Sequence, residues 1–254
     1  MQANRPAFAK IIITMALMAL PMAARADEDY QKNFTAANSL YDQGKFDEAR
    51  KLYETDVAGG KYSPELFYNL GNTDFRLDQT GHAILNYERA LALEPNNPEI
   101  QANLAYARAQ AGARVAEPTW RDEAIMNFGV NGYSLLAVVA AWAAIFAIAA
   151  LLFRPASFRV SLVLTTFCCA AVLGYAIFAI HHLEQNKALA IVTEKSTEAR
   201  YAPADNSTLA GTLPEGSRVW ILERRGPWVY CRLPDNTRAW ITSGSVERVR
   251  LQNS

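Results

Sequence analysis

The side chains best suited to chemistry do not form a catalytic pattern. His181 and His182 are adjacent at the end of a long apolar run. At this position they fit a spacer at the membrane interface better than a metal site. His82 stands alone in a predicted turn. The sequence has no G-x-S-x-G, H-E-x-x-H, phosphate-binding loop or Cys-x-x-Cys pattern. We therefore expect no catalytic residue, no metal site and no cofactor, in a protein that is not an enzyme.

The cysteines do not change this expectation. Cys168 and Cys169 are neighbours inside an apolar run, where they pack as small apolar side chains. Cys231 lies between Tyr230 and Arg232 in a strand-like run, and this setting favours a buried structural thiol over a reactive one.

Two apolar runs in the middle of the chain decide its class. Tyr133–Phe153 and Val160–Ile180 each extend over 21 residues without a charge. A helix needs roughly 20 apolar residues to cross a bilayer, so we predict transmembrane helices at 133–153 and 160–180; a pair of buried core helices is the alternative. The connection 154–159 carries Arg154 and Arg159, which predicts a cytoplasmic loop.

Residues 1–26 have the features of a secretory signal peptide. Arg5 and Lys10 form a basic start, an apolar run follows, and Ala24-Arg25-Ala26 offers small residues at a cleavage position. Export of the chain beyond this signal agrees with the cytoplasmic loop. We therefore expect a two-pass protein of the bacterial inner membrane, in contact with the lipid bilayer, with both globular parts in the periplasm.

The first of these parts, residues 27–115, has an internal repeat of 34 residues. Ala83 follows Ala49 by this spacing, and Tyr87 follows Tyr53. The pattern resembles the tetratricopeptide repeat, whose unit is a pair of antiparallel helices. The resemblance implies two units and a capping helix without a partner helix, followed by a juxtamembrane linker at 116–132; a generic helical hairpin domain is the alternative.

Tetratricopeptide repeats line a concave groove with residues of their first helices, and the resemblance places a peptide-binding groove on the same positions here. The groove residues are Asn38, Tyr41, Tyr68, Asn69, Asn72, Asn103 and Tyr106. The basic residues that grip a peptide carboxylate in some members are missing, because Phe34, Glu99 and Asn103 occupy those positions. Asparagines can instead pair with a peptide backbone. We expect replacement of Asn38 and Asn69 to leave folding intact; ordinary surface asparagines are the alternative.

The C-terminal part, residues 181–254, changes to short β-rich runs separated by Gly and Pro turns. The runs at 198–203, 213–217, 226–228 and 240–241 resemble bacterial SH3-like domains, which implies a small all-β barrel. The aromatic residues Trp220, Trp228, Tyr230 and Trp240 offer a possible ligand surface. Core or rim positions in so small a barrel are the alternative.

Charge differs between the two globular parts. Residues 27–124 carry 10 Lys and Arg against 17 Asp and Glu, a net charge of −7, whereas residues 183–254 carry 10 against 8, a net charge of +2. Opposite signs favour mutual contact or a basic partner, and a solvated acidic surface is the simpler explanation. No basic patch interleaved with aromatic residues appears, so we expect no nucleic acid partner.

The expected fold is a multidomain membrane protein: an all-α repeat domain, a two-helix transmembrane hairpin and a small all-β SH3-like barrel. This order resembles the BatE family of the bacterial aerotolerance operon. The resemblance implies a protein-interaction scaffold for envelope-stress resistance, with other membrane proteins as partners, among them von Willebrand factor A-type Bat proteins. A peptidoglycan-binding anchor acting through the SH3-like domain is the alternative. A sensor is disfavoured because the cytoplasmic loop is too short for a signalling domain.

Overall fold

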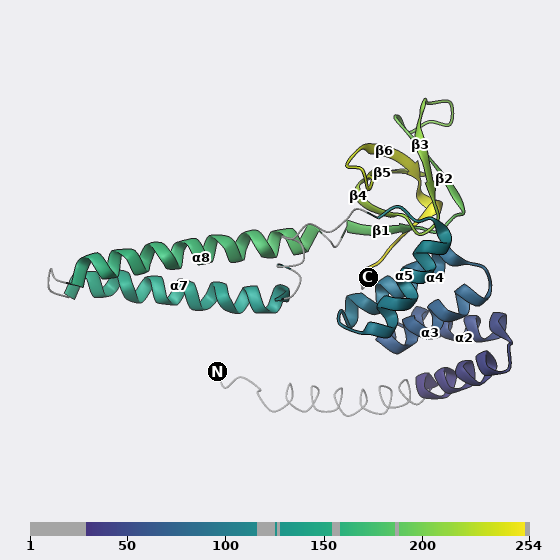
Figure 1. The fold of residues 1–254 in the computed structure, drawn as a ribbon, viewed down its shortest axis with the longest axis horizontal. Coiled ribbons are helices and arrows are strands. Elements are labelled where there is room, and N and C mark those ends of the chain that lie inside the picture. The colour runs from purple at the N-terminus through teal and green to yellow at the C-terminus, as the bar shows by residue number, and fades with distance from the viewer. Residues whose placement is uncertain (1–28, 116–124, 126–127, 154–157, 186–187, 252–254) are drawn as a thin grey trace, which may run out of the picture.

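A computed structural model describes residues 29–115, 125, 128–153, 158–185 and 188–251. The predicted signal peptide, most of the juxtamembrane linker and most of the cytoplasmic loop lie outside these residues. A helical part, two long helices and a sheet follow one another along the chain (Figure 1).

The helical part consists of short helices that alternate in direction. They are the helix of residues 29–42, α2 (Phe46–Ala58), α3 (Pro64–Arg76), α4 (Thr80–Leu93) and α5 (Pro98–Ala111). The Ser63 hydroxyl accepts a hydrogen bond from the Leu66 N–H and so caps α3, and Asn97 caps α5 in the same way. Gly112 ends α5 in the left-handed conformation.

Small residues let these helices approach one another closely. Gly71 on α3 lies directly against α4, because a Cβ added there would be 2.8 Å from the ring of Tyr87. Ala37 and Ala49 are fully buried beside Tyr53 in a first apolar cluster. This alternation of small and large residues is what a stack of paired helices needs, and the helical part is therefore like a tetratricopeptide repeat.

The long helices α7 (Gly129–Phe153) and α8 (Arg159–Gln185) pack side by side as a hairpin (Figure 1). Ala176 and Ala179 are fully buried between them. The stretches Asn131–Leu151 and Arg159–His181 are long and apolar enough to cross a membrane. Both overlap the spans predicted from the sequence.

The C-terminal part is one antiparallel sheet of seven strands in the order β3-β2-β6-β5-β4-β1-β7. The strands are β1 (Leu189–Val192), β2 (Ser196–Arg200), β3 (Leu209–Pro214), β4 (Arg218–Arg225), β5 (Trp228–Arg232), β6 (Arg238–Thr242) and β7 (Val246–Arg248). The expected closed barrel is wrong: among the described residues, β3 and β7 form two edges that do not pair.

The helical part explains why the sheet stays open. Ile191 of β1 and Val249, just after β7, are buried in one apolar cluster with Ile84 and Leu104 of α4 and α5. This end of the sheet therefore packs on helices rather than on β3. The contact is made by α4 against β1, and residues of the predicted capping helix α5 belong to the same apolar cluster.

Candidate peptide-binding face

The predicted groove residues lie on the first helices of successive helix pairs. Asn38 and Tyr41 are on the helix of residues 29–42, Tyr68, Asn69 and Asn72 are on α3, and Asn103 and Tyr106 are on α5. The four asparagines are half-buried, as are Tyr41 and Tyr68, while Tyr106 is 58% exposed. Together they form one face of the repeat part, which we call the asparagine face.

Hydrogen bonds fix the asparagine of the first unit from two sides. Asn38 Oδ1 accepts a bond of 2.6 Å from the Tyr53 hydroxyl, which comes from the second helix of the same unit. The same oxygen accepts a bond of 3.0 Å from Asn69 Nδ2, which comes from the next first helix. One carbonyl oxygen therefore joins three helices.

The second unit repeats this arrangement 34 residues later. Asn72 Oδ1 accepts a bond of 2.7 Å from the Tyr87 hydroxyl and one of 3.1 Å from Asn103 Nδ2. Each of the three residues follows its counterpart by the length of one repeat. An Asn–Tyr–Asn triad thus recurs along the face with the same bond pattern.

The tyrosines of the triads stay protonated and act as fixed donors. Burial raises the pKa of Tyr53 and of Tyr87 well above the ordinary value of a phenol. Burial also raises the pKa of Tyr68, whose hydroxyl donates to Glu99 Oε1 at 2.6 Å. The geometry of the asparagines is therefore insensitive to pH over the neutral range.

Two acceptor atoms on the face remain available. Among the described residues, no donor bonds to Oδ1 of Asn69 or of Asn103, whereas the Nδ2 atoms of both side chains are held by the triads. The ring centroids of Phe75 and Tyr106 lie 5.6 Å apart on the same side of the stack. The face thus offers oriented carbonyl oxygens beside aromatic side chains, a combination that suits an extended peptide.

The comparisons with known proteins identify the repeat. Residues 71–112 match the family model for the TPR repeat. The matched region contains α4, α5 and all three residues of the second triad. It therefore supports a tetratricopeptide part, for which protein–protein interaction is the general role.

Among solved structures, the chain is similar to PcrH from Pseudomonas aeruginosa. The sequences are 17% identical with a TM-score of 0.32, over 58% of this chain and 91% of that one. A similarity this low supports no further conclusion. No curated protein matches the chain.

The structure brings the four predicted aromatic residues of the sheet to one side. Tyr230 faces Trp240 across the β5–β6 ladder with ring centroids 4.9 Å apart, and Trp220 faces Arg232 across the β4–β5 ladder. Trp228 alternates with the fully buried Val229 and shares the side of Tyr230. Trp240 is nearly buried at 8% exposure, while the other three are half-buried.

The other side of these strands forms the core of the sheet. Cys231 is fully buried there, and burial raises the pKa of its thiol to about 12. A thiol in this state is protonated at neutral pH and is a poor nucleophile.

Reasoning from the sequence missed a polar junction between the repeats and the sheet. Glu88 on α4 accepts two hydrogen bonds from Arg218 of β4, at 2.7 and 2.8 Å, and also binds Arg108 of α5. Burial alone would raise the pKa of Glu88, but the charges of Arg218 and Arg108 lower it below its ordinary value. The carboxylate is therefore ionised and paired at neutral pH.

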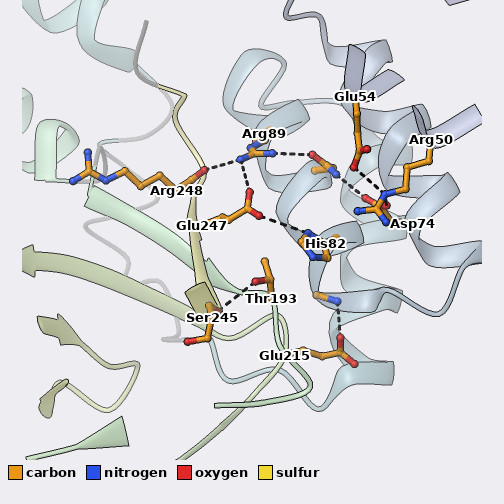
Figure 2. A network of polar contacts seen from close by, with 12 residues as sticks. Arg50, Glu54, Asp74, His82, Arg89, Thr193, Glu215, Ser245, Glu247 and Arg248 are labelled. Carbon is orange, nitrogen blue, oxygen red and sulfur yellow. Dashed lines mark hydrogen bonds and ion pairs between the residues drawn. The ribbon is translucent and has the colours of Figure 1, made fainter. Parts of the chain in front are cut away.

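A second group of polar contacts in this junction extends from α2 to β7 (Figure 2). Arg89 of α4 donates to Glu247 at 3.2 Å and to the Arg248 carbonyl at 3.1 Å. On its other side it donates to Asn86, which in turn donates to Asp74 Oδ2 at 2.8 Å.

Two further contacts belong to the junction. The Gly81 N–H donates to Glu215 at 2.8 Å (Figure 2), and Lys195 pairs with Asp78. Acidic and basic partners come from both parts, so the polar contacts are local pairs rather than an effect of opposite net charge.

Proposed function

We propose that this chain is a membrane-anchored scaffold whose asparagine face binds an extended segment of a partner protein. The observation that carries the proposal is the repeated Asn–Tyr–Asn triad. It holds two half-buried asparagines in a fixed orientation and leaves Oδ1 of Asn69 and Asn103 without a described donor. Backbone N–H groups of a peptide would supply those donors.

The chemistry of the face favours recognition of backbone over recognition of charge. No Lys or Arg belongs to the groove set, and Glu99, the ionisable neighbour, is occupied by Tyr68. A C-terminal carboxylate would therefore meet no cation on this face. Tyr41, Tyr68 and Tyr106 would contact apolar or aromatic side chains of the bound segment.

The hairpin is the proposed membrane anchor. The lengths and apolar compositions of α7 and α8 support two spans, and the signal-like N-terminus with the arginines of the short loop supports a cytoplasmic loop and two periplasmic parts. The resemblance to BatE makes other membrane proteins, including von Willebrand factor A-type Bat proteins, the proposed partners. The chain itself is proposed to act without catalysis.

Reporter fusions test this topology. Alkaline phosphatase fused after residue 125 or after residue 190 is expected to be active, and a fusion at residue 157 inactive. High activity of the fusion at residue 157 would contradict the proposed membrane topology. It would not bear on the peptide-binding proposal.

The binding proposal is tested by recovery of crosslinked partners with full-length protein purified from membranes. Asn69→Ala combined with Asn103→Ala removes both acceptor oxygens but leaves the bonds of Tyr53 to Asn38 and of Tyr87 to Asn72. Each lost hydrogen bond weakens binding by about fivefold, so recovery should fall by more than tenfold.

Asn33→Ala is the matched control. It removes a half-buried asparagine hydrogen bond, Asn33 to Asp56 at 3.1 Å, from outside the asparagine face. Equal recovery from the double variant, the control and the parent would show that the asparagines serve only the fold.

The alternative function assigns peptidoglycan to the sheet, because the C-terminal sequence resembles SH3-like domains and its aromatic residues share one side. Retention of the full-length protein on purified sacculi tests this function. Retention that survives replacement of Asn69 and Asn103 would separate it from peptide binding.

A further inference from the structure

The aromatic side of the sheet also carries arginines, which the sequence alone did not place there. Arg232 lies opposite both Trp220 and Arg238 in the β4–β5 and β5–β6 ladders, and Arg200 lies opposite Trp240. Residues directly opposite in antiparallel strands share a face. We call this surface the aromatic–arginine face; its members are Arg200, Trp220, Arg225, Trp228, Tyr230, Arg232, Arg238 and Trp240.

Stacking holds these cations over the rings. The Arg232 guanidinium is 4.4 Å from the centroid of Trp220, and that of Arg225 is 5.2 Å from Trp240. A guanidinium over an aromatic ring can still offer the N–H fork that binds a phosphate.

The face has a surplus of positive charge. Arg200 pairs with Glu198 and Arg225 pairs with Glu223. Arg232 and Arg238, in contrast, make no ion pair with any residue that the structure describes, and Arg238 is exposed. Two guanidinium groups thus remain to bind an external anion.

The chain holds this face close to the end of the hairpin. The apolar stretch of α8 ends at His181, its helix continues to Gln185, and β1 begins at Leu189. Four helical residues and four further steps span at most about 20 Å. The polar layer on one side of a bilayer is itself about 6 Å thick, so the sheet is tethered within reach of the headgroups.

The strands that supply most of the face lie towards the hairpin. In Figure 1, β4, β5 and β6 lie on the side of the sheet nearest to α7 and α8, whereas β2 and β3 lie further away. These three strands supply most of the face.

We propose that the aromatic–arginine face binds the anionic phospholipid headgroups of the membrane that holds the hairpin. Tryptophan and tyrosine favour the membrane interface, and arginine binds lipid phosphates. A contact that would be weak for a free protein is sufficient here, because the short tether keeps the local concentration high. The inference rests on the proposed membrane anchor and is independent of the asparagine face.

The test uses the full-length protein in lipid nanodiscs with a fluorophore on one introduced cysteine. Cys168 and Cys169 are replaced by alanine, while Cys231 is fully buried and stays. The probe position is Thr242, which is exposed opposite Trp228 on the face. The comparison position is Asp205, exposed in the loop that joins β2 to β3.

Headgroup-spin-labelled lipid should quench the probe at Thr242 more than the probe at Asp205. The quenching should increase when phosphatidylglycerol is added to phosphatidylcholine discs. Arg232→Gln with Arg238→Gln should weaken the contact by about fivefold for each arginine. The matched control is Arg224→Gln with Arg250→Gln, which removes two exposed arginines outside the face and should change nothing.

Four results would overturn the inference. Equal quenching at the two positions in phosphatidylglycerol discs would show that the face does not approach the lipid. Quenching that stays the same when Arg232 and Arg238 are replaced would assign the face to another contact. So would retention on sacculi that is lost with these two arginines, if the probe at Thr242 is not quenched. A third probe at Phe167, which is 72% exposed on α8, separates the anchor from the face. Quenching there by acyl-chain spin labels shows that the hairpin spans, and its absence would refute both proposals.

Discussion

Glu88 and Arg218 are 130 residues apart in the chain, yet two hydrogen bonds of 2.7 and 2.8 Å join their side chains. The pair connects the second helix of a repeat to a central strand of the sheet. Glu88 has a side-chain exposure of only 5%, so its charge depends on its arginine partners. The contact joins the two globular parts, and we expect them to unfold together.

This relationship predicts that Arg218→Ala destabilises the whole protein. Removing one partner of a buried ion pair typically costs about 3–5 kcal/mol, and because Arg108 still binds Glu88 we expect about 2–3 kcal/mol. Urea unfolding followed by circular dichroism should show one transition shifted for helix and sheet signals alike. Lys195→Ala breaks an exposed contact between the same parts and should leave the midpoint unchanged. Two separate transitions in the variant would show that the parts fold independently.

Gly71→Leu should unfold the repeat part through overpacking. A Cβ at Gly71 would meet the Tyr87 ring at 2.8 Å and the Ala83 carbonyl at 3.2 Å, so the longer side chain forces α3 and α4 apart. Overpacking costs about 1–3 kcal/mol, to be measured as a lower midpoint of thermal unfolding. Gly211→Ala, where nothing lies within 4 Å of the added atom, is the control. An unchanged midpoint for Gly71→Leu would contradict the helix pairing.

Asn38→Ala should cost stability, contrary to the expectation from the sequence. Tyr53 is 1% exposed and its hydroxyl donates to Asn38 Oδ1, so the change leaves a buried donor unpaired. The loss should be about 1–3 kcal/mol in urea unfolding. Asn38→Ala with Tyr53→Phe should recover part of it, because both partners are then absent. A double variant no more stable than Asn38→Ala would show that the bond contributes nothing.

Much of the architecture could be predicted from the sequence. The 34-residue spacing of Ala49 and Ala83 revealed the repeat, and the two uncharged runs predicted the long helices. β2, β3 and β7 lack the β-branched and aromatic runs that mark a strand, because Ser196–Arg200 and Val246–Arg248 contain charged residues and Leu209–Pro214 contains a glycine and a proline. They are strands because neighbouring strands supply hydrogen bonds that no local pattern records.

The triads could be predicted from the sequence, whereas the junction between the repeats and the sheet could not. Asn72 follows Asn38 by 34 residues and Asn103 follows Asn69 by the same spacing, so the alignment that paired Tyr53 with Tyr87 already contained the signal. The approach of Glu88 to Arg218 depends on how two separate parts dock. Nothing in the local sequence of α4 specifies that contact.

The last prediction concerns the pH dependence of stability. Burial raises the pKa of Asp74 to about 7, against the opposing charge of Arg50, and Glu54 of α2 and Arg89 of α4 also act on it. A folded-state pKa above the unfolded value means that the folded protein holds a proton between about pH 4 and pH 7 that the unfolded chain has lost. Stability should therefore fall as pH rises through this window, by on the order of 4 kcal/mol for a pKa that is raised by about 3.

Asp74→Asn isolates this contribution. The amide has the shape of the protonated carboxyl but cannot ionise, so the variant should lose the decline between pH 5 and pH 8. His82 has a pKa lowered chiefly by burial, and its neutral form stabilises the fold above its unfolded pKa. Its effect has the opposite sign and is present in both proteins. The measurement is the midpoint of urea unfolding at each pH for the parent and the variant. Parallel pH profiles would show that Asp74 is already ionised at pH 5, with Arg50 and Asn86 outweighing its burial.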